Sequence, residues 1–190
     1  MAPSKLNNYG WIVLDVDEAH EKQAREFRAK RDRLYGNIYS ERETDERWVG
    51  DLGEFAFKSW LNQKSNLQYE WIKENAAGKA DFIINPNISV GVKTVKRQAE
   101  PKINYTAQIT AKHAKEPTDY FFFLSYDFIK RQMWFLGGIG RQEFLNHARY
   151  HRAGEWVHSN YQIREGHEIY NGEIMKLTPP TDWLHEMETF

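Results

Sequence analysis

The sequence predicts an α/β protein with a central mixed β-sheet flanked by helices. Two long segments with helical patterns lie near the N-terminus, and short apolar runs separated by turn residues follow them. The chain has 190 residues, of which 41% are hydrophobic. A chain of this size can bury one full core, so we expect residues 1–190 to form a single domain.

The first segment without breakers covers residues 19–35, and Gly36 and Asn37 follow it as a stop signal. It carries many charges and only a thin apolar stripe. We therefore expect a surface helix within an N-terminal extension of residues 1–39.

A second helix is predicted from Ser40, which has Glu43 at capping-box spacing, to about residue 62. Its apolar positions recur on one face, and Glu54 lies on another. Gly50 and Gly53 flank Glu54. Since glycine costs about 1 kcal/mol inside a helix, we expect another backbone to approach closely there. This helix would hold Glu54 near the sheet.

The short apolar runs predict strands at residues 67–73, 81–84, 89–95, 105–110, 120–126 and 133–139, and further short helices at 141–149 and around Trp183 and Met187. Residues 120–124 are continuously apolar, which is typical of a strand buried on both faces. The core is thus expected at about residues 40–127, with a C-terminal, β-rich extension over residues 128–190.

Three ionisable residues stand out by position: Glu54 in the second helix, Asp81 at the start of a strand, and Lys93 towards the end of the next strand. A turn at residues 85–87 separates these two strands. Antiparallel pairing would bring Asp81 and Lys93 to the same end of the hairpin. Carboxylate oxygens are ligands that Mg²⁺ prefers, and a lysine can orient water or stabilise developing charge.

The three residues stand in the runs GDLGE, ADFII and VGVKT. Their order across about residues 40–127 resembles the PD-(D/E)XK nuclease superfamily. The resemblance implies a restriction-endonuclease-like core of αβββαβ order, Glu54 and Asp81 as ligands of Mg²⁺ or Mn²⁺, and Lys93 as a catalytic residue. The chain departs from the family pattern at Gly91, two residues before the lysine, where Glu, Asp or Gln is usual.

The expected function is metal-dependent hydrolysis of DNA phosphodiester bonds by an endonuclease. The formal net charge is −1, so contacts with nucleic acid must come from local basic segments. Lys79, Lys96, Arg97 and Gln108 are predicted to make such contacts, although exposed strand ends and open sheet faces also carry these residue types. The residues do not distinguish DNA from RNA. Duplex cleavage on both strands needs two sites, so a homodimer is expected.

Two other readings stay open. Gly91 favours a catalytically inactive nuclease fold that is kept for binding nucleic acid or for assembly. A carbohydrate- or protein-binding domain would follow if Glu54, Asp81 and Lys93 lay far apart.

The absence of cysteine excludes disulfides, thiolate metal sites and cysteine nucleophiles. No run approaches the roughly eighteen apolar residues of a membrane helix, and the N-terminal residues lack the apolar region of a secretory signal. We expect no membrane partner and a cytoplasmic protein of a bacterium or a phage-infected cell.

Overall fold

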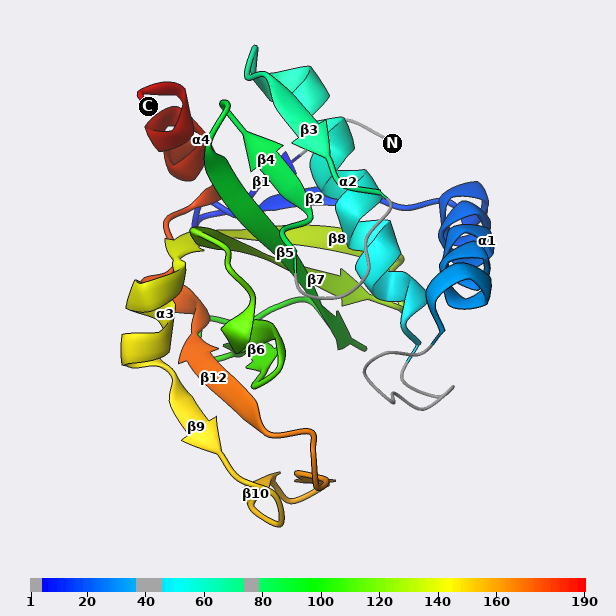
Figure 1. Ribbon diagram of the computed structural model, residues 1–190, viewed down its shortest axis with the longest axis vertical. Coiled ribbons are helices and arrows are strands. Elements are labelled where there is room, and N and C mark those ends of the chain that lie inside the picture. The colour runs from blue at the N-terminus through cyan, green and yellow to red at the C-terminus, as the bar shows by residue number, and fades with distance from the viewer. Residues whose placement is uncertain (1–4, 37–45, 74–78) are drawn as a thin grey trace.

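A seven-stranded mixed sheet forms the centre of the molecule, with the strand order β1-β2-β8-β7-β5-β4-β3 (Figure 1). The computed structural model describes residues 5–36, 46–73 and 79–190. The strands of this sheet are β1 (Lys5–Leu6), β2 (Ile12–Asp15), β3 (Tyr69–Trp71), β4 (Phe82–Ile84), β5 (Ile88–Arg97), β7 (Tyr120–Asp127) and β8 (Gln132–Gly140). β5 and β7 run parallel, whereas the other neighbouring strands pair antiparallel. The expected mixed α/β architecture is therefore present.

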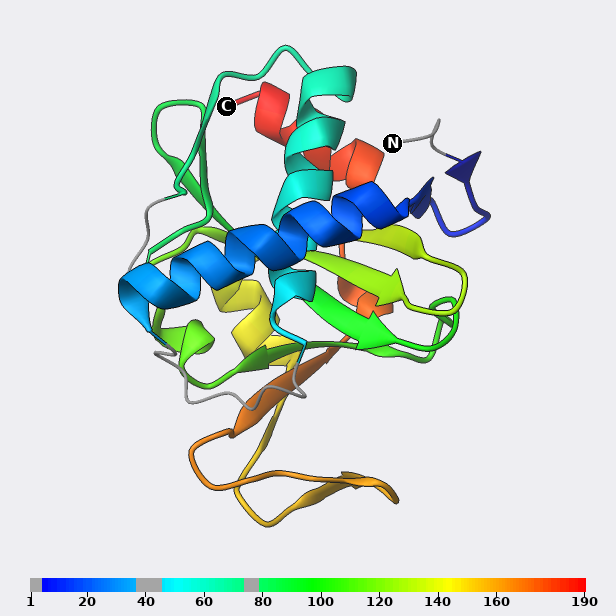
Figure 2. The ribbon, with the colours of Figure 1, turned by 90° about the vertical axis from the view of Figure 1, so that its right-hand side faces the viewer.

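Four α-helices lie in the described part of the chain: α1 (Glu18–Tyr35), α2 (Trp48–Lys64), α3 (Arg141–His147) and α4 (Pro180–Glu188). α1 begins where Asp17 accepts a hydrogen bond from the His20 N–H, and it ends at Gly36, whose φ of 73° requires a glycine-like conformation. Figure 2 shows α1 lying across α2.

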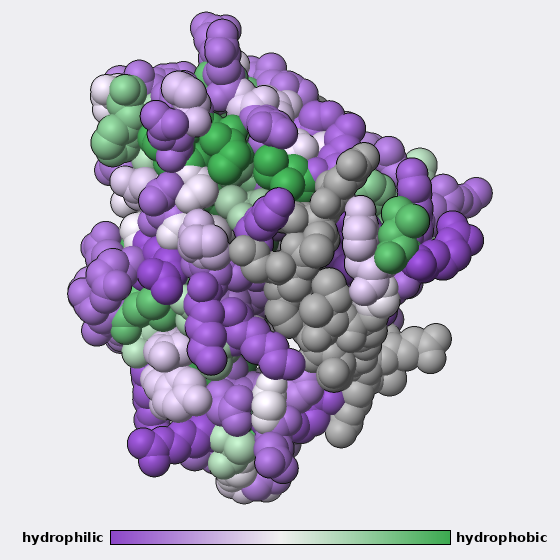
Figure 3. Space-filling view, viewed as in Figure 1, coloured by the Kyte–Doolittle hydropathy of each residue, from purple (hydrophilic) through white to green (hydrophobic). Residues whose placement is uncertain are grey.

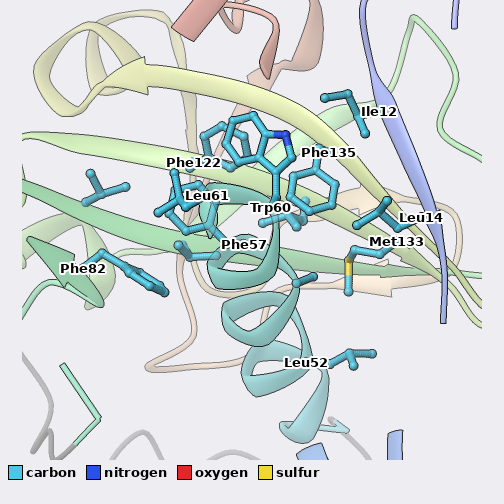
Figure 4. Packing of buried hydrophobic residues seen from close by; sticks show 14 of the residues in the cluster. Ile12, Leu14, Leu52, Phe57, Trp60, Leu61, Phe82, Phe122, Met133 and Phe135 are labelled. Atoms are coloured by element: carbon cyan, nitrogen blue, oxygen red, sulfur yellow. The ribbon is translucent and has the colours of Figure 1, made fainter. Parts of the chain in front are cut away.

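α2 covers one face of the sheet and supplies most of the larger core. Phe57 and Trp60 contact Phe122 on β7, and Trp60 also contacts Phe135 on β8 (Figure 4). These aromatic side chains are buried. Burial of a large apolar side chain contributes about 1.5–3 kcal/mol, so this face fixes α2 against the sheet.

A second core lies on the opposite face, under a three-stranded antiparallel sheet of order β6-β12-β9. Its strands are β6 (Thr106–Thr110), β12 (Ile169–Glu173) and β9 (Arg149–His151). Phe121 and Phe123 of β7 pack here against Phe144 of α3. β7 is therefore buried on both faces, as its continuous apolar run predicts.

The segment between β9 and β12 extends away from the body of the molecule (Figure 1). It contains β10 (Trp156–His158) and β11 (Tyr161–Gln162), which pair antiparallel. We call residues 152–168 the arm. The arm and the two short 3-10 turns, η2 (His113–Lys115) and η3 (Ile174–Lys176), complete the described elements.

The structure corrects two expectations about the core. α2 begins at Trp48 rather than at Ser40, because Glu46 has a φ of 51° and cannot continue a right-handed helix; the proposed Ser40–Glu43 capping box lies outside the described residues. The connection from β5 to β7, residues 98–119, contains β6 and η2 instead of the α-helix that an αβββαβ order requires.

The face seen in Figure 3 is mostly hydrophilic. None of the helices formed by the described residues combines the length and the apolar character needed to cross a bilayer.

Candidate functional site

The hairpin of β4 and β5 places Asp81 and Lys93 beside each other, as its spacing predicts. β4 pairs with β5 only from Phe82↔Val90 to Ile84↔Ile88. Beyond this short ladder, the Asp81 backbone N–H donates to the Val90 carbonyl at 3.0 Å, and the Asp81 carboxylate accepts the Val92 N–H at 2.7 Å. The carboxylate thus takes the place of a strand partner at the end of β4.

The Lys93 ammonium lies between two carboxylates. Its Nζ is 3.0 Å from Oε2 of Glu116 and 3.9 Å from Oδ2 of Asp81. Side-chain exposure is 11% for Lys93, 6% for Glu116 and 23% for Asp81. Glu116 follows η2 and precedes β7, so it comes from a part of the chain that the motif does not include. Sequence reasoning missed it.

Glu54 approaches this group from α2 on the other side of β5. A Cβ atom added to Gly53 would lie 1.9 Å from Oγ1 of Thr94, so the absence of a side chain at Gly53 lets the helix contact β5. This confirms a close approach at Gly53, although the neighbour is a side chain. At Gly50, no atom of the described residues lies within 4 Å of such a Cβ atom, so the described part of the chain shows no close approach there.

Both oxygens of Glu54 already accept hydrogen bonds. Arg31 of α1 donates to them at 2.9 and 3.1 Å, and the indole N–H of Trp71 donates to Oε2 at 2.9 Å. Glu54 nevertheless acts electrostatically on both Asp81 and Lys93. The charges of the three predicted residues therefore act on one another, and Arg31 adds a further cation beside Glu54.

Asp51, one turn before Glu54, is a second residue that sequence reasoning missed. It is fully buried and accepts hydrogen bonds from Arg28 at 2.6 Å and Arg31 at 2.8 Å. Burial raises the pKa of Asp51 to about 6, against the opposing effect of Arg28, and Glu54 raises it further. The ion pairs between α1 and α2 thus fix the helix that carries Glu54.

Burial raises the pKa of Asp81 to about 7, although the Lys93 ammonium opposes this shift. The negative charges of Glu54 and Glu116 contribute to the increase. For Lys93, burial disfavours the charged form, but the neighbouring carboxylates of Asp81 and Glu116 outweigh burial and raise the pKa. Lys93 is therefore an ammonium at neutral pH.

A cleft of about 480 Å³ runs past these side chains. Its lining includes three of the residues predicted to contact nucleic acid, namely Lys79, Lys96 and Gln108. Arg97 does not line this cleft: its guanidinium donates to the Thr106 carbonyl at 3.0 Å and lies over the Tyr105 ring. Arg97 connects β5 to β6, which is a structural role that the sequence did not indicate.

His113 and part of the arm complete the cleft. His113 lies 3.8 Å from Glu116, and burial, followed by the nearby charges of Lys93 and Lys112, lowers its pKa well below the usual range. From the arm, Tyr161, Arg164 and His167 form part of the lining. No local motif marks these arm residues, because only the pairing of β12 with β6 brings the arm to the cleft.

Among the residues that the structure describes, no three His, Asp or Glu side chains are arranged as a ready metal-binding group. Neither a scan against models of protein families nor a search of curated proteins found a match for the chain.

Proposed function

We propose that this protein is a metal-dependent nuclease of the PD-(D/E)XK type that hydrolyses DNA phosphodiester bonds. One observation carries the proposal: at an end of the β4–β5 hairpin, in a cleft, the Lys93 ammonium lies within 4 Å of the carboxylates of Asp81 and Glu116. Phosphodiester hydrolysis needs oxygen ligands for a divalent cation and a positive charge near the reacting phosphate, and this group supplies both.

The order of the elements supports the restriction-endonuclease-like core in part. α2 is followed by the antiparallel meander β3-β4-β5, and β7 then pairs in parallel with β5. Glu54, Asp81 and Lys93 occupy α2, the start of β4 and β5, which is the order that the family resemblance implies. The helix expected between β5 and β7 is replaced by β6 and η2.

The carboxylate oxygens of this site are suitable ligands for Mg²⁺ or Mn²⁺. Mg²⁺ usually takes one or two protein carboxylates and completes its octahedron with water and substrate phosphate, so a site with few protein ligands suffices. Oδ1 of Asp81 accepts no hydrogen bond from any described residue, and Asp81 is partly exposed to the cleft. When bound, the cation would bind the scissile phosphate and lower the pKa of the attacking water.

The chain's own residues then have distinct roles. Asp81 would hold the cation through its oxygens. Lys93 is protonated at neutral pH, so it would stabilise negative charge on the phosphate and would not act as a general base. Lys79 and Lys96, which line the cleft, would bind the phosphates that flank the reacting one.

The test uses the purified protein with plasmid, single-stranded and branched DNA, and with an RNA of matched sequence. Each substrate is incubated with Mg²⁺, with Mn²⁺ and with a chelator. We expect cutting that requires the metal and that is lost in both Asp81→Ala and Lys93→Ala. Lys130→Ala is the matched control, because Lys130 is half exposed and pairs with Glu100 outside the cleft. Cutting that survives both cleft substitutions would refute the proposal.

A second candidate is a nuclease fold that binds nucleic acid without cutting it. Two observations favour it: Gly91 stands where the family has an acidic residue, and Arg31 already holds both oxygens of Glu54. Binding of the same DNA substrates with no cutting in either metal would select this candidate.

A further inference from the structure

The space beside Gly91 is filled by the side chain of Lys93. A Cβ atom added to Gly91 would lie 3.3 Å from Cε of Lys93 and 3.5 Å from its Nζ. Asp81 lies along the same stretch of β5, because its N–H donates to the Val90 carbonyl and its carboxylate accepts the Val92 N–H. An acidic side chain at position 91 would therefore point towards the ammonium and lie near Asp81.

Glu116 delivers a carboxylate to this same ammonium from a different element. Its Oε2 lies 3.0 Å from the Lys93 Nζ, and its side chain is buried. Buried carboxylates are rare unless they are paired or bind a cation, because desolvation of the charge costs several kcal/mol. The Glu116 carboxylate is thus held by its contact with the Lys93 ammonium and not by hydration.

The backbone around Glu116 is fixed. The Glu116 N–H donates to the His113 carbonyl at 3.1 Å, and its own carbonyl accepts the Thr118 N–H at 2.9 Å. Arg141 at the start of α3 donates twice to the Ala114 carbonyl, at 3.1 and 2.6 Å. These bonds hold η2 against α3 and aim the Glu116 carboxylate at Lys93.

Glu54 is engaged differently. Its two oxygens accept three hydrogen bonds from Arg31 and Trp71, so it would have to give up part of this set to bind a cation. Glu116 instead lies 3.0 Å from the Lys93 ammonium, and its Oε1 is 3.8 Å from Nε2 of His113. Of the two acids near Asp81, Glu116 is the one on the Lys93 side.

We propose that Glu116 is the second acidic ligand of the divalent cation, together with Asp81, and that it takes the place of the carboxylate absent at Gly91. Glu54 keeps its ion pair with Arg31 and positions α2. This inference rests on the proposed function, because it assigns a ligand to the same metal site.

The experiment measures Mn²⁺ affinity by calorimetry on the full chain without DNA, for the wild type, Glu116→Gln and the double variant Gly91→Glu/Glu116→Gln. Glutamine keeps the size of the side chain and an oxygen next to Lys93. We expect Glu116→Gln to weaken Mn²⁺ binding by at least about tenfold, since loss even of groups that support a ligand costs about 10–100-fold. The double variant should recover most of this loss.

Glu143→Gln is the matched control, because Glu143 is an exposed acid on α3 outside the cleft, and its Mn²⁺ affinity should equal that of the wild type. Near-ultraviolet circular dichroism checks that each variant is folded. If Gly91→Glu disturbs the packing against Phe121, the shorter Gly91→Asp replaces it in the double variant.

The outcomes separate the two proposals. A wild-type protein that binds no Mn²⁺ refutes the proposed function itself. If Glu116→Gln binds Mn²⁺ as tightly as the wild type does, Glu116 is not a ligand of the cation. If Glu116→Gln loses Mn²⁺ affinity, and neither Glu nor Asp at position 91 restores it in folded double variants, the carboxylate of Glu116 does not take the place of one at position 91.

Discussion

Gly50 and Gly53 lie one turn apart in α2, and replacing each by alanine should have opposite effects on stability. Alanine favours a helix interior over glycine by about 1 kcal/mol. A Cβ atom at Gly50 meets no atom of the described residues within 4 Å, so Gly50→Ala should raise the free energy of unfolding by up to about 1 kcal/mol.

At Gly53 the same gain is opposed by a clash with β5. The added Cβ atom would lie 1.9 Å from Oγ1 and 3.1 Å from Cβ of Thr94. Thr94 is β-branched, and its Cβ cannot move without the backbone, so rotation of the side chain does not remove the contact. Overpacking costs about 1–3 kcal/mol. The net effect of Gly53→Ala should be a loss of up to about 2 kcal/mol.

Urea denaturation followed by circular dichroism measures both variants, and an unchanged denaturant slope shows that the unfolded state is comparable. The double variant Gly53→Ala/Thr94→Ala isolates the contact, because it removes Oγ1 of Thr94. We expect it to be more stable than the sum of the single changes predicts, by about 1–2 kcal/mol. If Gly53→Ala stabilises the protein as much as Gly50→Ala does, α2 does not approach β5 as described.

The remaining predictions concern charge and the arm. Because the pKa of Asp81 is about 7 in the folded state against an ordinary value of 3.8, the native state keeps a proton that the unfolded state releases between about pH 4 and 7. The free energy of unfolding should therefore fall as pH rises through this window, by at most about 1.4 kcal/mol per pH unit for this group, and denaturation across pH should show a smaller fall in Asp81→Asn. Arg31→Ala leaves the buried carboxylates of Asp51 and Glu54 without this partner, so it should lower the free energy of unfolding, measured with urea, by about 3–5 kcal/mol. Arg33→Ala, an exposed change on the same helix, should change it by no more than about 0.5 kcal/mol. Equal losses in the two variants would contradict the ion pairs of Arg31 with Asp51 and Glu54. Trp156 in the arm is 62% exposed, while the other six tryptophans are buried or half-buried. Single-stranded DNA, added in the presence of a chelator, should therefore quench tryptophan fluorescence in the wild type, and this quenching should be largely lost in Trp156→Phe. Full quenching in that variant would exclude stacking of bases on Trp156.

The sequence was sufficient for features that depend on local pattern. The apolar run of β7, the charged helix α1 and the hairpin of β4 and β5 follow from periodicity and turn residues within short segments. The contact between Asp81 and Lys93 belongs to this class, because twelve positions and one turn determine it. A register set by a short turn leaves little freedom.

Features set by long-range packing could not be predicted in this way. Glu116 precedes β7, and it reaches Lys93 only because β7 pairs in parallel with β5. Arg31 reaches Glu54 because α1 crosses α2, which no spacing within either helix encodes. β12 is short, and its pairing with β6 and with β9 spans a long stretch of turn-rich sequence. One signal was available: Glu116 lies four residues before the central buried strand, and an acid near that end of the strand is a candidate for the site.

The charges around Asp81 account for the high pKa of its carboxyl group. Lys93 is one cation placed between the two carboxylates of Asp81 and Glu116, and Glu54 adds further negative charge to their surroundings. Since Arg31 neutralises Glu54 directly, the uncompensated charge lies at Asp81, where burial makes it most costly. In the absence of another cation a proton relieves this cost. The divalent cation of the proposed function would displace that proton and relieve the cost more strongly. Its affinity should therefore rise as pH passes 7.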